Sequence, residues 1–264
     1  MSALWAFVQR DMRVQASYRF ALAESFLGVV FAAATYYFLG QLIVGSEEVG
    51  NANGSYFGFA IVGLILTAFL DASIFQVATV FRTEQSLGTL DALLATPISL
   101  PTVLLGSALW PYTLVALQVV VYAVVAVFLG VDFQHANWLG GLLVVCLSAG
   151  GFACLSIAEA GIGIVIKRGN PLAWLLSTFS ALVGGAFFPV SLLPGWLQVL
   201  SLLHPLSYAT HAARAALLGG ASFAELAPDL VVLATFDLLA VPLSLWVFGW
   251  AVRNARTDGS MAHV

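Results

Sequence analysis

Charged residues are scarce in this sequence. Only 8% of its 264 residues are Asp, Glu, Lys or Arg, whereas 61% are hydrophobic, and the mean hydropathy is +1.00. Soluble globular proteins carry about 25% charged residues. A chain with so little charge cannot cover the surface of a water-soluble fold of this size. We conclude that it is an integral membrane protein.

Lysine is nearly absent, and this excludes one kind of nucleotide site. The single lysine, Lys167, follows an isoleucine in the stretch VIKRGN. A phosphate-binding loop needs Gly-Lys-Ser or Gly-Lys-Thr, so we predict that this polypeptide is not itself an ATPase. The net charge of -4, without a basic block, gives no indication of nucleic acid or an anionic surface as a partner.

Motifs for other membrane chemistry are missing as well. The sequence has neither a His-Glu-x-x-His pair nor a Gly-x-Ser-x-Gly elbow. Cys146 and Cys154 are separated by about 12 Å along a helix axis and cannot pair with each other. His204 and His211 lack a third ligand, and we interpret them as interfacial hydrogen-bonding groups. We expect no catalytic residue and no metal site. A membrane enzyme with weak motifs is the alternative.

Six apolar runs are long enough to cross a hydrocarbon core about 30 Å thick, which takes about 20 residues. They are too long for barrel strands, and backbone groups in lipid need internal hydrogen bonds. The expected fold class is therefore an all-α membrane protein with six transmembrane helices, in a single domain of residues 1–264. The runs are 20–44, 57–80, 102–130, 138–166, 171–193 and 229–251.

An even number of spans places both termini on one side of the membrane, and basic residues indicate that this side is cytoplasmic. Arg214 alone among the nine basic residues lies opposite, where Glu47, Glu48, Asp132, Glu225 and Asp229 gather. We predict a multi-pass protein of the plasma (inner) membrane with both termini cytoplasmic. The basic residues on the cytoplasmic side are Arg10, Arg13, Arg19, Arg82, Lys167, Arg168, Arg253 and Arg256.

The N-terminal segment 1–19 predicts a helix that lies in the membrane surface. Leu4, Val8 and Met12 recur every four residues among polar side chains. The arginines of this segment follow its apolar residues rather than precede them, so we expect no cleaved signal peptide. An ordinary cytosolic lead-in is the alternative.

Two segments between the apolar runs have unusual patterns. Residues 82–101 predict a short cytoplasmic helix with an apolar stripe of Leu87, Leu90 and Leu94, and such a stripe needs a partner. Residues 184–220 are apolar but are divided by prolines into pieces of about 10 to 14 residues. These pieces are too short to cross the bilayer, and they predict a re-entrant helical hairpin that enters from outside.

Four acidic residues fall inside the apolar runs, where a charge costs about 2.5–3.5 kcal/mol at a helix centre. Glu24, Asp71 and Glu159 lie toward the cytoplasmic half, and Asp237 lies in the last run. One hypothesis is that some of the first three face a substrate path and attract a cationic amphiphile. The alternative is that they hydrogen-bond neighbouring helices or reach the interface.

The two unusual segments together resemble the type 2 ABC-transporter permeases. Residues 84–97 follow the pattern acidic-x-x-x-Gly-Thr-Leu-acidic-x-Leu-Leu-x-Thr-Pro of that family's first cytoplasmic loop. The second segment is similar to its extracellular re-entrant segment. The residues that carry this second similarity include Phe188, Pro189, Pro194, Trp196, Pro205, Tyr208 and Arg214.

The resemblance implies a function for residues 82–101. In this family the loop forms a coupling helix that docks on a separate ATPase subunit. A solvated amphipathic loop without such a role is the alternative. Gln85 and Ser86 stand where relatives often have more charge. The residues to which the resemblance assigns coupling are Arg82, Glu84, Gly88, Thr89, Leu90, Asp91, Leu94, Thr96 and Pro97.

The resemblance also implies partners and a cargo class. Two permease copies, expected as a homodimer, and two ABC ATPase subunits would form an exporter in the lipid bilayer. ATP and magnesium would bind the ATPase, with no cofactor in this chain. The expected cargo is a hydrophobic or amphiphilic small molecule such as a drug or antibiotic, and the alternative is a lipid-linked polysaccharide or glycolipid. An ion-coupled secondary transporter that uses Asp71, Glu159 or Asp237 is an alternative of another class.

Overall fold

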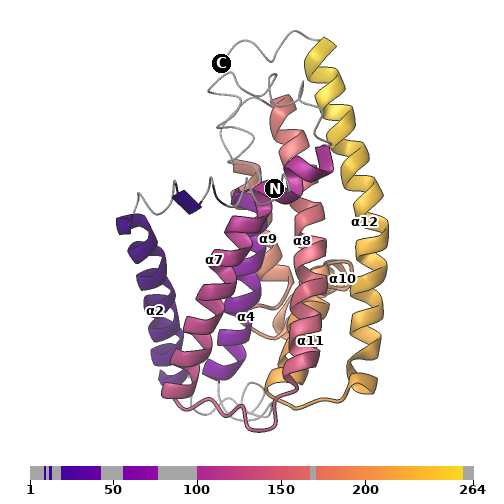
Figure 1. Cartoon of the computed structure of the whole chain (residues 1–264). Coiled ribbons are helices and arrows are strands. Elements are labelled where there is room, and N and C mark those ends of the chain that lie inside the picture. Colours follow the sequence, from indigo (N-terminus) through magenta and orange to yellow (C-terminus); the bar gives the residue numbers. More distant parts are fainter. Residues whose placement is uncertain are drawn as a thin grey trace.

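The computed structural model describes residues 9, 12, 13, 19–42, 56–76, 100–166 and 171–257. Within these residues the regular structure is helical and contains no strand (Figure 1). Among the described helices, five are long and apolar enough to cross a membrane. The predicted all-α class is confirmed, and the chain has the composition of a multi-pass membrane protein.

The first four long helices follow the predicted spans closely. They are α2 (Arg19–Leu42), α4 (Tyr56–Asp71), α7 (Leu100–Phe128) and α8 (Trp138–Ile166). A π-helical turn, η1 (Ala72–Gln76), continues α4. The agreement arises because length and apolar content are local properties of each run.

The predicted fifth span, 171–193, is longer than the helix that forms there. Helix α9 (Pro171–Val183) has 13 residues, about 20 Å, and this is shorter than a hydrocarbon core of about 30 Å. The chain then turns at residues 184–188, where Gly185 adopts a φ of 63°. An L residue with a side chain rarely adopts this conformation, so the turn ends the helix.

Between α9 and the last long helix lie three short elements. They are the 3₁₀ turn η2 (Val190–Leu192), α10 (Gly195–Leu202) and α11 (Pro205–Leu217). The last helix, α12 (Phe223–Thr257), has 35 residues and contains the whole predicted span 229–251. It therefore extends beyond that span at both ends.

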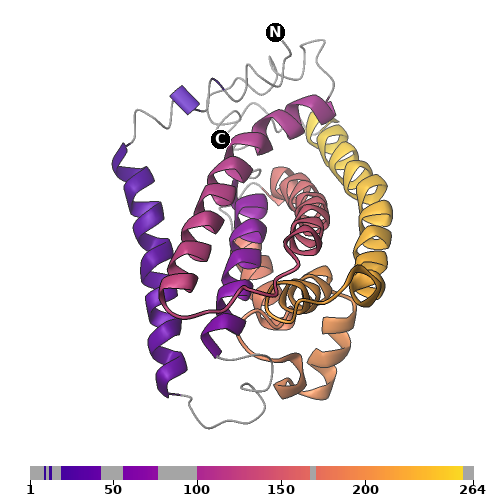
Figure 2. The same ribbon diagram turned by 60° about the horizontal axis from the view of Figure 1, so that its bottom comes forward.

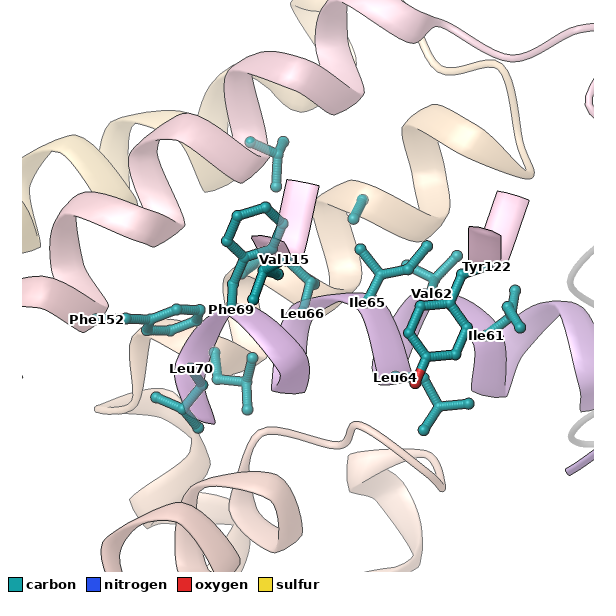
Figure 3. Packing of buried hydrophobic residues seen from close by; sticks show 14 of the residues in the cluster. Ile61, Val62, Leu64, Ile65, Leu66, Phe69, Leu70, Val115, Tyr122 and Phe152 are labelled. Atoms are coloured by element: carbon teal, nitrogen blue, oxygen red, sulfur yellow. The ribbon is translucent and has the colours of Figure 1, made fainter. Parts of the chain in front are cut away.

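Helix α4 is the centre of the bundle. It contacts α2, α7, α8, α9 and α11, and Figure 2 shows it enclosed by these helices, with α2 and α12 at opposite edges. Twelve of the 16 residues of α4 are buried. Figure 3 shows Ile61, Leu66 and Phe69 packed beside Val115, Tyr122 and Phe152.

The outer helices expose large apolar side chains. Phe31 of α2, Phe128 of α7 and Trp246 of α12 are each more than 60% exposed. Contiguous apolar surface of this kind is unfavourable in water but suits lipid chains. The outward faces of the bundle are therefore suited to contact lipid chains.

Two predicted elements fall largely outside the described residues. Within 1–19, Gln9, Met12, Arg13 and Arg19 are helical, and Met12 and Arg13 are exposed. The predicted coupling helix, 82–101, lies outside the description except for its last two residues. Leu100 and Pro101 belong to the first turn of α7, a position that tolerates proline.

Candidate functional site

The non-spanning segment after α9 is enclosed by hydrogen bonds from its own helices. At the end of α9 the carbonyl of Val183 accepts from Ser201 Oγ at 2.7 Å and from Ser207 Oγ at 3.3 Å. The next carbonyl, that of Gly184, accepts from Thr210 Oγ1 at 2.8 Å. Side chains of α10 and α11 thereby replace the helical partners that these carbonyls lack.

Arg214 of α11 completes the same set of bonds. Its Nη1 donates to the carbonyl of Gly185 at 2.9 Å, and its Nη2 donates to that of Ala186 at 2.7 Å. Its Nε donates to the carbonyl of Phe59 in α4 at 3.2 Å, and the guanidinium carbon lies 3.3 Å from the centre of the Phe59 ring. Burial lowers the pKa of Arg214 to about 9, which leaves the side chain protonated at neutral pH. Arg214 thus joins α11 and α4 to the turn.

Close backbone contact accompanies these bonds. A Cβ atom added to Gly63 of α4 would lie 1.8 Å from the carbonyl oxygen of Ala186. No side chain fits in this space, so α4 and the turn meet backbone to backbone. The glycine at position 63 is required by packing, a role that the sequence analysis did not assign to it.

His204 starts α11 from the end of α10. It is the N-cap residue, its Nδ1 accepts from the backbone N–H of Leu206 at 3.2 Å, and Pro205 follows in the first turn. Its Nε2 lies 2.9 Å from Ser180 Oγ in α9. Burial lowers the pKa of His204 to about 4, so the ring is neutral near pH 7. Because Nδ1 accepts, Nε2 carries the proton and donates to Ser180.

His211 makes a separate contact, in which its Nδ1 lies 2.6 Å from Asp229 Oδ2 of α12. The two histidines therefore have different partners. Each makes hydrogen bonds of the kind that the sequence analysis expected.

The other predicted residues of the segment shape its turns. Pro189 and Pro194 are the N-cap residues of η2 and α10, and Tyr208 Oη donates to the carbonyl of Leu202 at 2.8 Å. Phe188 packs against the small cluster around Val183, and Trp196 is 67% exposed.

The three acidic residues of the predicted substrate path lie in different surroundings. Glu24 is exposed on α2, where the bundle has its edge. Asp71 at the end of α4 accepts a hydrogen bond from Ser177 of α9. Glu159 of α8 is 5% exposed. The contact of Asp71 is of the helix-to-helix kind that the alternative hypothesis predicted.

Asp237 also lies against a neighbouring helix. A Cβ atom added to Gly150 of α8 would lie 2.9 Å from its Oδ2, and one added to Gly151 would lie 2.9 Å from its Oδ1. The glycine pair makes room for this carboxyl between α8 and α12.

A polar contact near η1 was missed by sequence reasoning. Tyr112 Oη of α7 donates to the carbonyl of Ala149 in α8 at 3.0 Å and also contacts Ser73 Oγ of η1. The centres of the Tyr112 and Phe69 rings are 6.1 Å apart. A single tyrosine in an apolar run carries no signal that identifies its partners, because they lie on other helices.

The residues assigned to coupling lie outside the described part of the chain. They are Arg82, Glu84, Gly88, Thr89, Leu90, Asp91, Leu94, Thr96 and Pro97. Their assignment stays a prediction.

Comparison with known proteins agrees with a membrane protein. Residues 2–218 match the family described as ABC-2 type transporter. The chain is 28% identical over 173 residues to nodulation protein J of Rhizobium meliloti (strain 1021), a match that covers 65% of this chain and 66% of that protein, just under two thirds. It is 24% identical over 247 residues to inner membrane transport permease YadH of Escherichia coli (strain K12), with coverage of 91% and 89%.

The chain therefore belongs to the ABC-2 type transporter family. The resemblance drawn from its two unusual segments is confirmed.

Proposed function

We propose that this chain is the membrane subunit of an ATP-driven exporter of the plasma membrane. Two copies form the translocation path, and each copy docks on a separate ABC ATPase that binds ATP and magnesium. Three findings support this proposal: membership of the ABC-2 family, five helices of spanning length, and similarity to a protein named as an inner membrane transport permease.

The observation that carries the proposal is the enclosed backbone after α9. In the bilayer, non-helical backbone is tolerated where protein groups satisfy its polar atoms. Here four successive carbonyls, from Val183 to Ala186, accept hydrogen bonds from side chains of α10 and α11. With 8 and 13 residues, both helices are too short to span. These features support a re-entrant hairpin of residues 184–220 that enters the membrane from outside.

The same arrangement supports a six-crossing topology. In this proposal α9 and the turn that follows it make the fifth crossing, and α12 makes the sixth. Helices α2 and α12 then begin and end on the same side of the membrane. The distribution of basic residues assigns the cytoplasm to this side.

The cargo that we propose is a hydrophobic or amphiphilic small molecule, such as a drug or antibiotic. The apolar composition of the spans and the acidic residues Asp71 and Glu159 support this choice. A lipid-linked polysaccharide or glycolipid is the alternative within the same machinery. Glu24 is exposed, so it contacts either a second copy of the chain or lipid. It belongs to the path only if it contacts the second copy.

Coupling to the ATPase can be tested by measuring ATP hydrolysis by the complex in lipid nanodiscs. We expect Gly88→Arg or Leu90→Arg to abolish the stimulation of ATP turnover by cargo, because either change puts a bulky charge on the predicted docking face. The matched control is Gln134→Arg, a change at an exposed residue of the 129–137 loop. Transport of cargo without any ATPase, unaffected by the loop changes, would contradict the proposal and favour an ion-coupled transporter.

A further inference from the structure

The charge of Arg214 is not matched by a nearby anion in the described part of the chain. Between described residues the structure has one ion pair, and it joins His211 to Asp229. The partners of Arg214 are neutral carbonyls and an aromatic ring. Such groups satisfy hydrogen bonds but do not neutralise a charge, and a buried charge without a counter-charge is costly.

Arg214 also retains hydrogen-bonding capacity. A guanidinium has five N–H donors, and three of its nitrogens each donate once to the carbonyls of Phe59, Gly185 and Ala186. Among the described residues, one N–H on each Nη atom therefore has no hydrogen-bond partner. A guanidinium with two remaining N–H donors is well suited to bind a phosphate or carboxylate.

A cavity of about 390 Å³ adjoins this side chain. Phe59, Pro189, Val190 and Leu218 supply most of its apolar wall. Its polar lining comes from Arg214, His211, Ser207 and Thr210. The hydroxyls of Ser207 and Thr210 donate to carbonyls at the end of α9, so Arg214 is the cation with free donors in this wall. The walls fit an occupant with an anionic group and an apolar part.

The position of the cavity agrees with such an occupant. Phe59 is three residues after Tyr56, where α4 begins, which is about 4.5 Å along the helix axis. Leu218 and Gly219 follow the end of α11, and the 218–222 connection leads into α12. The cavity thus lies at the end of the bundle where α4 and its candidate span begin.

We propose that Arg214 and the cavity beside it form a binding site for a phosphate group, carried by an anionic amphiphile or free in solution. Three sources share this chemistry: the headgroup of an anionic bilayer lipid, a phosphate-bearing cargo, and free phosphate. The site requires no ATPase. If the binding site is disproved, the proposed exporter function still stands. If the exporter function is disproved, the binding site still stands.

The test uses the full chain in neutral detergent micelles, without ATPase. Phosphatidylglycerol, phosphatidylcholine or inorganic phosphate is titrated in, and an apparent Kd is obtained from the rise of the unfolding temperature. We expect wild type to bind phosphatidylglycerol with a lower apparent Kd than phosphatidylcholine. Loss of one charged hydrogen-bonding group predicts about 10- to 100-fold weaker binding for Arg214→Gln, and a smaller loss for Arg214→Lys, which keeps the charge.

A second variant separates binding from folding. Arg214→Gln also removes bonds to the turn and can unfold the protein, whereas Ala215→Phe fills the cavity and leaves Arg214 in place. We expect Ala215→Phe to weaken phosphatidylglycerol binding to a similar extent. The matched control is Ala234→Phe on the exposed face of α12, which should bind as wild type does.

Each result decides the proposal. If inorganic phosphate stabilises wild type as well as phosphatidylglycerol does, with the same dependence on Arg214 and Ala215, the site stands and its occupant is a free anion. If only the stabilisation by phosphatidylglycerol depends on Arg214 and Ala215, the site stands and binds an amphiphile. Equal stabilisation by phosphatidylcholine, or equal binding by wild type and Ala215→Phe, would overturn it.

Discussion

At the scale of single residues, small groups in this protein decide how closely its elements approach. Gly63 lets α4 touch the carbonyl of Ala186, and Gly150 and Gly151 make room for the carboxyl of Asp237. A Cβ atom added to Gly28 would meet nothing within 4 Å, so this glycine serves no comparable packing role. Glycine content alone therefore does not reveal which glycines matter. The contact that each one makes determines its importance.

The glycine at position 63 provides a stability test. Gly63→Ala puts a methyl group into the space held by the Ala186 carbonyl, and such overpacking typically costs about 1–3 kcal/mol. We expect a lower unfolding temperature in detergent. Gly28→Ala is the control and should be neutral or stabilising by up to about 1 kcal/mol, because alanine favours the helix. Equal effects of the two changes would show that the contact is unimportant.

At the scale of elements, the segment from α9 to α11 is held together mainly by side chains that bond to backbone. Ser201, Ser207, Thr210 and Arg214 all donate to carbonyls at or after the end of α9. His204 adds a contact to Ser180 while it caps α11. The segment behaves as one packed unit, which permits its backbone to leave the helical pattern.

One hydroxyl in this unit can be removed with little change of shape. Thr210→Val leaves the buried carbonyl of Gly184 without its side-chain donor, and an unsatisfied buried acceptor costs about 1–3 kcal/mol. We expect a lower unfolding temperature for this variant. Thr235→Val in α12 is the control, because Thr235 Oγ1 bonds within its own helix to the carbonyl of Val231. Equal decreases in unfolding temperature for Thr210→Val and Thr235→Val would argue against a special role for Thr210.

At the scale of the whole molecule, the acidic residues are spread over separate helices rather than gathered in one site. Asp71 joins α4 to α9 through Ser177, Glu159 is buried in α8, and Glu24 is exposed at the edge of the bundle. A path that uses them all would have to involve a second copy of the chain. The proposed exporter therefore assigns a direct role first to Asp71 and Glu159.

Transport of matched cargoes tests this role. We expect Asp71→Asn and Glu159→Gln to reduce export of a cationic amphiphile roughly tenfold, equivalent to about 1.4 kcal/mol, with little effect on a neutral analogue. The amide introduced by Asp71→Asn still has an oxygen that can accept from Ser177, so the helix contact is preserved. Asp132→Asn, at an exposed loop position, is the control. Equal loss for both cargoes would assign these carboxyls to packing instead.

The sequence by itself determined the membrane class, the family resemblance and the positions of most long helices. These follow from apolar length, from prolines and from two local motifs, and neighbouring residues suffice to define each of them. The tertiary structure alone decided where α9 ends. Residues 184–193 are apolar enough to continue a span, but Thr210 and Arg214 donate to the carbonyls of residues 184–186 in the turn at 184–188. It likewise decided the separation of the acidic residues and the cavity beside Arg214, because both depend on contacts between helices that are distant in the chain.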